Sequence, residues 1–385
     1  MLKNETITKR MLFGYILLIS AIVLQTVLLW NEYEWYEKFA PLSTLISFFF
    51  LVACAFCFTD MKQAMRDPFF YICIAGSLIA GINLVIIGSN KGAWLTATDV
   101  LLVAYLADKV RTNRLLVWFT CAYTGFYFFY WTFDVKGYFK GYNTNYGGLV
   151  LITGFVFAVT GLFLFREKLK GTEEKGKVFL TFFIAFMFAW GYNIIAWYRA
   201  RCALLGFAVF AVLLLVPEKI WKKRAFYVVV TLCMTVGAVL ISIVYVILGL
   251  LPGFFEVRIF YKDVISGRNE IWLDLWRAFL HKPLTGIGSS YVINVDWMTG
   301  VFEVHNGLLD ILIVHGIIVF AITCFLLVNR LLALHKYACG NIVARSAVSA
   351  VFAILAASFM ENFFIVPPFL LCTLALIAIA RSDIV

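Results

Sequence analysis

Residues 178–216 read VFLTFFIAFMFAWGYNIIAWYRARCALLGFAVFAVLLLV, and this stretch decides the fold class. Its 39 residues are nearly all apolar, which is too long for one helix across a hydrocarbon core of about 30 Å. Arg199 and Arg201 stand in its middle, and an arginine at mid-bilayer costs at least about 2.5–3.5 kcal/mol on insertion scales. We therefore expect the two arginines to mark a turn between two membrane-spanning helices.

The second of these helices is short, because it runs only from Cys202 to Val216. At 1.5 Å per residue it reaches about 22 Å, so a full crossing would begin below the outer surface. Arg201 would then lie at the floor of a cavity. Side chains two residues apart on a helix point about 200° away from each other, so Arg199 and Arg201 can share a ligand only if the backbone there is unwound.

The whole chain has the composition of an integral membrane protein. Of its 385 residues, 63% are hydrophobic and 14% are charged, whereas a soluble domain carries roughly a quarter charged residues. This composition excludes soluble enzymes. The net charge of +10 is explained by Lys and Arg in cytoplasmic loops, not by a nucleic-acid partner. The nine Cys lie mostly inside apolar runs, so we expect neither disulfides nor a metal site.

The apolar runs predict an all-α polytopic bundle of about twelve transmembrane helices, forming a single integral membrane domain over residues 1–385. Most Lys and Arg fall in the inner loops when the N-terminus is placed inside, as the positive-inside rule requires. Both termini are therefore expected in the cytoplasm and the Arg199–Arg201 turn outside. The predicted spans are 11–30, 42–59, 69–88, 93–107, 115–133, 146–165, 178–198, 202–216, 226–250, 306–329, 342–360 and 363–380.

The segment 251–304, between the ninth and tenth spans, is the only sizeable predicted region outside the membrane. It contains two stretches too short to cross, 254–266 and 270–281, and the second has its apolar side chains at helical spacing. Both predict amphipathic helices that lie on the membrane or cap the bundle. The segment therefore forms a large outer loop, periplasmic or extracellular, within the membrane domain.

Several residues with useful chemistry are expected at this outer surface. The guanidinium group is permanently charged and offers a planar fork of donors suited to phosphate oxygens. A histidine is the side chain most readily tuned to act as a base near neutral pH. Together they predict a site for an anionic, phosphate-bearing substrate with a proton acceptor. The candidates are Arg199, Arg201, Arg258, Arg268, His305 and Asn306.

Some of these residues also fit structural roles without any contact with substrate. Arg199 is equally well explained as an interfacial residue that reaches the headgroups. Arg258 fits the solvated face of an amphipathic helix better than a direct contact with substrate. Glu361 and Asn362 are expected to form the tight outer turn between the last two spans. The hypothesis of a phosphate site is strongest for Arg201, Arg268 and His305.

Short motifs in the chain resemble those of the O-antigen ligase and polymerase family of bacterial surface-glycan assembly. Their order, the twelve-span layout and the large outer loop are similar as well. Two positions depart from the family pattern: Ala200 stands where Ser is usual, and Thr144 replaces a Pro. The matching motifs are Asn143–Asn145, Arg201–Gly206, Ser266–Arg268 with Ile271–Trp272, Pro283–Gly288, His305–Leu309 and Gly316–Ile317.

The resemblance implies a metal-independent glycosyltransferase of the GT-C type, with no cofactor, in the bacterial inner membrane. Such an enzyme takes a glycan from undecaprenyl pyrophosphate at the outer leaflet and passes it to a sugar hydroxyl. By position, Arg201 and Arg268 would hold the pyrophosphate and His305 would orient or deprotonate the acceptor. Arg199, Arg258, Asn306 and Asn145 are the expected substrate-binding residues. The implied partners are the lipid-linked donor, the glycan acceptor, the lipid bilayer, a chain-length regulator and a flippase.

Three functions remain open from the sequence. We favour a polymerase that joins lipid-linked repeat units, over a ligase that moves finished glycan to a different acceptor. A lipid-oligosaccharide flippase or transporter is the alternative from another class, since about twelve spans are common there. A transporter should show paired, repeat-related halves or charges along a central path. The unusual charges here gather at one face instead. This asymmetry favours the enzyme.

Overall fold

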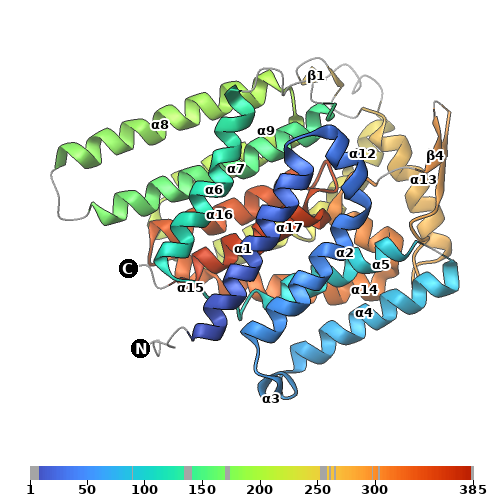
Figure 1. Ribbon diagram of the computed structural model, residues 1–385. Coiled ribbons are helices and arrows are strands. Elements are labelled where there is room, and N and C mark those ends of the chain that lie inside the picture. The colour runs from blue at the N-terminus through green and yellow to red at the C-terminus, as the bar shows by residue number, and fades with distance from the viewer. Residues whose placement is uncertain are drawn as a thin grey trace.

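The computed structural model describes residues 8–88, 90–133, 141–169, 174–251, 258–259, 262–263, 266–296, 298–301 and 304–382. These residues form a helical bundle with two small β-hairpins (Figure 1). The helices of the first half are α1 (Lys9–Trp30), α2 (Tyr33–Phe58), α3 (Met61–Ala64), α4 (Pro68–Ile87), α5 (Lys91–Leu106), α6 (Arg114–Phe133), α7 (Thr144–Lys168) and α8 (Glu174–Trp197). Those of the second half are α9 (Arg201–Leu215), α10 (Glu218–Trp221), α11 (Arg224–Met234), α12 (Gly237–Gly249), α13 (Arg268–His281), α14 (Gly307–Ala333), α15 (His335–Ala338), α16 (Ile342–Ala357), the short 3₁₀ helix η3 (Phe363–Ile365) and α17 (Pro367–Ala380).

Every predicted span contains a helix, so the prediction of an all-α multi-pass membrane fold is confirmed at that level. Six described helices are long and apolar enough to cross a membrane: α1, α2, α4, α7, α8 and α14. The pair α11 and α12, bent by 57° at a short break, would make a seventh. Helices α9, α16 and α17 are apolar but shorter. The number of twelve crossings therefore stays a prediction.

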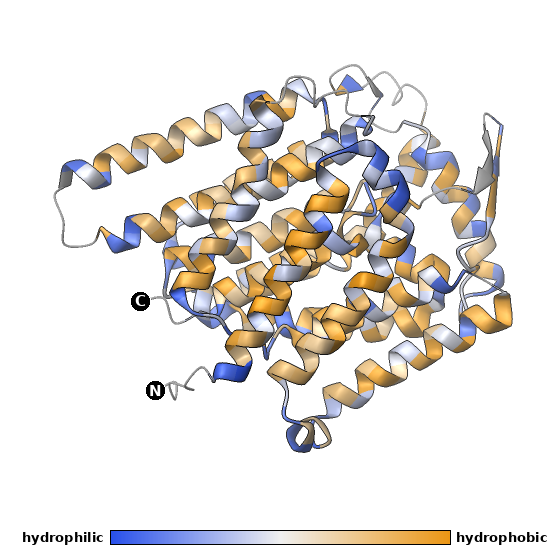
Figure 2. Cartoon of the chain, viewed as in Figure 1, coloured by the Kyte–Doolittle hydropathy of each residue, from blue (hydrophilic) through white to orange (hydrophobic). Residues whose placement is uncertain are grey.

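The centre and the rim of the bundle differ in how their apolar side chains are used. Helices α16 and α17 lie in the middle of the molecule (Figure 1) and are buried along almost their whole length. Helices such as α8 turn large apolar side chains outward, and Phe179 is 71% exposed. Figure 2 shows the same apolar character along the outer helices. A helix apolar all round is buried in protein or in lipid, so the exposed faces suit a bilayer.

The expected turn at the two arginines is confirmed. Helix α8 ends at Trp197 and α9 begins at Arg201. Between them Arg199 adopts a left-handed φ of 52°, and Ala200 is extended. A Cβ at Gly148 of α7 would lie 2.2 Å from the Cβ of Ala200, so the turn packs directly against the α7 backbone. A larger residue at position 200 would crowd this contact.

The segment 251–304 differs in part from the prediction. The helix expected over 270–281 is confirmed as α13. The helix expected over 254–266 is wrong where the structure describes that segment, because β1 (Arg258–Ile259) pairs antiparallel with β2 (Lys262–Asp263). A short apolar run does not distinguish a strand from a helix by its period. A second hairpin, β3 (Val292–Val295) with β4 (Met298–Val301), was not predicted.

The loop after α13 lies against a break in α14. Gly316 has φ 86° and ψ 170°, so α14 is two helices across a kink. Backbone hydrogen bonds join Ile287 N to Ile313 O at 2.8 Å, and Ile317 N to Pro283 O at 2.8 Å. These bonds satisfy peptide groups that the kink removes from the helix ladder. The two glycine-rich motifs at 283–288 and 316–317 are therefore packed against each other.

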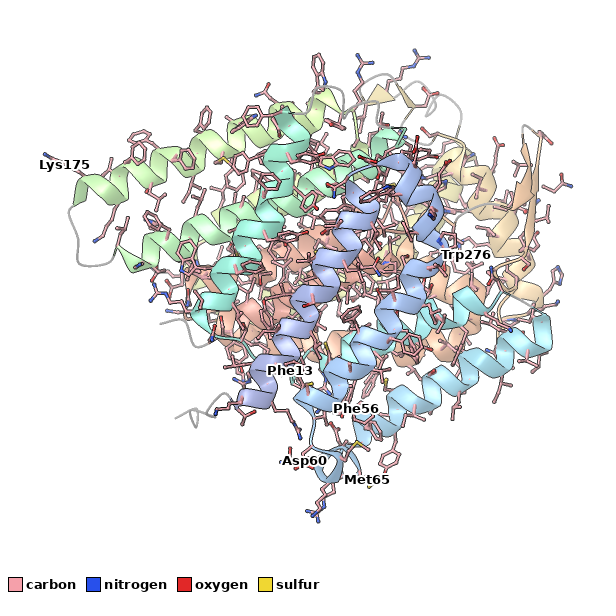
Figure 3. The ribbon with its side chains drawn as sticks, viewed as in Figure 1. Phe13, Phe56, Asp60, Met65, Lys175 and Trp276 are labelled. Carbon is pink, nitrogen blue, oxygen red and sulfur yellow. The ribbon has the colours of Figure 1, made fainter. Side chains whose placement is uncertain are left out.

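The two ends of the bundle can be followed in Figure 3, where Lys175 and Trp276 are labelled at opposite sides of the molecule. Lys175 stands at the start of α8, one helix length from the turn at Arg199. Trp276 belongs to α13, whose first residue is Arg268. The basic α7–α8 connection and the arginines of the α8–α9 turn are therefore at opposite ends of α8.

Candidate functional site

A cavity of about 210 Å³ lies between the start of α9, helix α12, the start of α13 and the turn after α16. Figure 1 shows α9, α12 and α13 converging below β1. The sequence candidates Arg201, Arg268 and Asn145 all line this cavity. The remaining lining residues are Cys202, Leu205, Tyr245, Ile259, Met360 and Glu361.

Arg201 connects the bundle to the segment 251–304. As the first residue of α9 it follows the extended Ala200. Its guanidinium donates to the backbone carbonyl of Asp263 and, at 2.7 Å, to the hydroxyl of Ser266. The side chain is partly buried and forms part of the cavity wall. Arg201 thus lines a cavity, and its predicted place at the floor of that cavity stays a prediction.

Arg268 is more deeply buried. It begins α13 after Gly267, which has a left-handed φ of 72°, and it is 7% exposed. One guanidinium nitrogen, Nη2, donates to Met360 O and to Glu361 Oε1, each at 2.8 Å. The Nε–H is buried and has no hydrogen-bond partner among the described residues. A buried donor without a partner requires an explanation, and a bound anion would supply one.

His305 joins the site through a shared carboxylate. Its Nδ1 lies 2.8 Å from Glu361 Oε2, and its side chain is 22% exposed. Asn145 Nδ2, from α7, donates to Glu361 Oε1. Glu361 therefore links Asn145, Arg268 and His305, although these residues are far apart in the sequence.

Glu361 is the residue that the sequence analysis missed. The expected turn is present, since Glu361 follows the end of α16 and precedes η3. The carboxylate, however, faces the cavity and is buried, with 7% of the residue exposed. A signal was available, because an ionisable residue at the end of a membrane span is a functional candidate by default.

The backbone is strained at the same place. Among the residues that the structure describes, three non-glycine residues have positive φ: Arg199 at 52°, Ser266 at 48° and His305 at 55°. Each is a site candidate or lies within two residues of an arginine of the cavity. Such conformations cost of order 1–3 kcal/mol each and cluster at functional sites. The backbone thus marks the same region as the side chains.

The charges of the cavity favour an anion. Arg201 and Arg268 contribute two positive charges, and Glu361 contributes one negative charge. The ion pair between Arg268 and Glu361, at 2.8 Å, is buried on both sides. Because buried like charges are costly unless compensated, a lining with two guanidinium groups and one carboxylate favours an anion.

Asn306 caps a helix in this structure. Its side chain is fully buried and accepts from Leu309 N at 3.1 Å, at the start of α14. The amide nitrogen donates to Ala238 O. Both ends of the side chain thus hold the start of α14, and a contact of Asn306 with substrate stays a prediction.

Arg258 and Arg199 lie outside the cavity wall. Arg258 is on β1, is 69% exposed and pairs with Asp263 at 3.2 Å, which matches the solvated alternative for this residue. Arg199 is exposed at the α8–α9 turn and is not among the lining residues. A contact of either residue with substrate stays a prediction.

The predicted absence of a metal site stays a prediction too. In the described part of the chain, no group of three or more His, Cys, Asp or Glu residues is arranged to hold a metal ion. The charged residues that do gather at the cavity are chiefly arginines, which bind anions directly.

Comparison with known proteins gives a match to one family. The model of the O-antigen ligase family matches residues 182–324. No curated protein and no solved structure matches the chain. The matched region includes Arg201, Arg268 and His305, whereas Asn145 and Glu361 lie outside it. The match confirms the resemblance of residues 182–324 to the O-antigen ligase family.

Proposed function

We propose that this membrane protein is a polysaccharide polymerase that transfers a glycan from undecaprenyl pyrophosphate to a sugar hydroxyl of another lipid-linked repeat unit. The family match supports a glycosyltransferase-like membrane enzyme. The observation that carries the proposal is the cavity in which Arg201 and Arg268 meet, with His305 tied to Arg268 through Glu361.

The two arginines would bind the pyrophosphate of the donor. Arg268 has a buried Nε–H without a partner among the described residues, and a phosphate oxygen would accept from it. Negative charge grows on the pyrophosphate as the bond to the sugar breaks. Fixed guanidinium groups therefore stabilise the transition state more than the ground state. In this way arginines supply the charge that a metal ion supplies in other transferases.

His305 would take the proton of the acceptor. The acceptor oxygen forms the new bond to the anomeric carbon, and the electron pair of the broken C–O bond leaves with the pyrophosphate. The hydroxyl proton passes to the imidazole. Nδ1 is engaged by Glu361 at 2.8 Å, so the accepting nitrogen in this proposal is Nε2.

The proposed site faces the outer side of the bacterial inner membrane, with both termini in the cytoplasm. Basic side chains such as Arg166, Lys168 and Lys175 gather at the α7–α8 connection. Positive residues next to short loops favour the cytoplasmic side. The arginine cavity is at the other end of α8 and would open toward the outer leaflet, where the lipid-linked glycan is presented.

Reconstitution tests the function directly. Purified protein is incubated with a lipid-linked repeat unit, and the products are separated by length. A ladder of lengthening glycans is expected. A single transfer to a different added acceptor would identify a ligase, and no transfer to any acceptor would overturn the proposal. His305→Ala is expected to abolish extension while protein level and donor remain intact; retained extension would remove His305 as the base.

A further inference from the structure

The carboxylate of Glu361 is divided between two tasks. Oε1 accepts from Arg268 Nη2 at 2.8 Å and from Asn145 Nδ2, while Oε2 lies 2.8 Å from His305 Nδ1. Glu361 is nearly as buried as Arg268. The group expected to bind the donor and the group expected to activate the acceptor thus share one counter-charge.

We infer that Glu361 is a positioning residue that couples donor binding to acceptor activation: when the pyrophosphate arrives, Glu361 loses its ion pair with Arg268 and keeps its hydrogen bond to His305. This inference rests on the proposed function of the site. Glu361 itself contacts neither reacting atom in this scheme. It sets the orientation of His305 and competes with the donor for Arg268.

The first step concerns the imidazole. A carboxylate oxygen within hydrogen-bond distance of Nδ1 favours the tautomer with the proton on Nδ1. The lone pair is then on Nε2, which is the nitrogen assigned to the acceptor. The same carboxylate stabilises the imidazolium that forms when the proton is taken, as in histidine–carboxylate pairs of hydrolases.

The second step concerns the arginine. Nη2 of Arg268 divides its donors between Met360 O and Glu361 Oε1. An incoming pyrophosphate carries more negative charge than one carboxylate and also repels that carboxylate. The guanidinium is therefore drawn toward the phosphate, and its hold on Glu361 weakens.

Asn145 makes this exchange workable. Its amide donates to the same oxygen, Oε1, that Arg268 uses. When Arg268 turns to the phosphate, Oε1 keeps one donor and the carboxylate keeps its orientation. The negative charge of Glu361 is then no longer neutralised by Arg268, and the carboxylate still accepts from His305. Acceptor activation is thereby strongest when the donor is bound, which limits proton transfer in an empty site.

The coupling predicts opposite effects in one variant. Glu361→Gln has nearly the same shape but lacks the charge. Turnover should fall by up to about 10⁴-fold, the loss that neutralising the acid of such a histidine pair causes in a serine protease. Affinity for inorganic pyrophosphate should stay equal or increase, because the competing negative charge has been removed. A residue with only a structural role would lower both quantities.

The test measures both quantities on the full-length protein in detergent. Calorimetry gives the affinity for inorganic pyrophosphate, and the extension assay gives kcat and KM. Glu218→Gln is the matched control, because Glu218 is exposed on α10 and pairs with Lys222 at 2.6 Å, beyond the opposite end of α9 from Arg201. It should change neither quantity. Near-normal kcat in Glu361→Gln, or a loss of pyrophosphate affinity equal to the loss of kcat, would overturn the coupling.

A spectroscopic measurement covers the case in which Glu361→Gln does not fold. The chain has four His, so ¹⁵N-histidine spectra of the wild type can be assigned with a His305→Gln variant. The inference expects the His305 proton on Nδ1, and a proton on Nε2 would contradict it. Failure of the wild type both to bind pyrophosphate and to transfer glycan would instead overturn the proposed function itself.

Discussion

The helical backbone is interrupted within α14 and between α8 and α9, and the two interruptions are built in different ways. In α14, Gly316 takes a φ of 86° and faces the loop that contains Gly286, with φ 76°. Backbone hydrogen bonds such as that from Gly288 N to Val314 O, at 3.2 Å, close the gap. At the α8–α9 turn the positive φ belongs to Arg199 instead, and the next helix begins with Arg201, which lines the cavity.

The difference shows which irregularities belong to the scaffold and which to the site. Glycine adopts positive φ without steric penalty, so the α14 break requires no compensation and fixes helix packing. Arg199, Ser266 and His305 adopt positive φ against their preference. Ser266 and His305 hydrogen-bond to Arg201 and Glu361, two residues of the cavity wall. The residue type at positive φ therefore separates a break of the scaffold from a break at the site, which the break alone does not do.

Arg268→Lys has the largest expected effect and tests the functional side of this comparison. Lysine keeps the charge but cannot reproduce the planar fork, so turnover should fall by about 10³-fold, equivalent to about 4 kcal/mol of transition-state stabilisation. The extension assay and thermal unfolding are measured together, and the unfolding temperature should change little. If Arg268→Lys extends glycan at a rate close to the wild type, Arg268 does not hold the pyrophosphate.

Gly286→Ala tests the other side of the comparison. A Cβ at Gly286 would lie 2.4 Å from Val314 O, and φ is positive, so the free energy of unfolding should drop by about 2–4 kcal/mol. Specific activity of the remaining folded protein should be preserved. Gly176→Ala is the control, since its nearest neighbour, a Leu169 methyl, is 3.9 Å away. A large loss of activity per folded molecule in Gly286→Ala would place this loop in the site.

Asn306→Ala gives the smallest expected effect and tests the role of Asn306 as a helix cap. Loss of the cap should lower stability by about 0.5–2 kcal/mol, because Leu309 N loses its acceptor. Turnover of the folded protein should change far less than in Arg268→Lys. The measurement is a chemical or thermal unfolding curve alongside the extension assay. A pronounced increase in donor KM without a change in stability would instead show that Asn306 takes part in substrate binding.

The sequence predicts those features that depend on local pattern. The long apolar runs indicate the helices, and the two arginines locate the turn at Arg199. The apolar spacing of 270–281 identifies α13. The motif order supplies Arg201, Arg268 and His305, of which the two arginines line one cavity and His305 is joined to it by hydrogen bonding.

Features that depend on long-range contact were not predictable in the same way. Glu361 meets Asn145 across 216 positions and Arg268 across 93, and no spacing rule relates such distances. The capping role of Asn306 was not predicted because the residue follows His305, although an Asn before an apolar helix is an ordinary cap signal. The β1–β2 hairpin was read as a helix because its run is too short to show a period.

The most direct test of the central claim, that arginines of the cavity supply the charge for the leaving pyrophosphate, is a stoichiometric transfer reaction in excess EDTA. Purified protein is given lipid-linked repeat units, and released undecaprenyl pyrophosphate is counted against new glycosidic bonds. One pyrophosphate carrier released per bond is expected, with the same rate with and without EDTA. Transfer that stops in EDTA and returns with Mg²⁺ would contradict the claim.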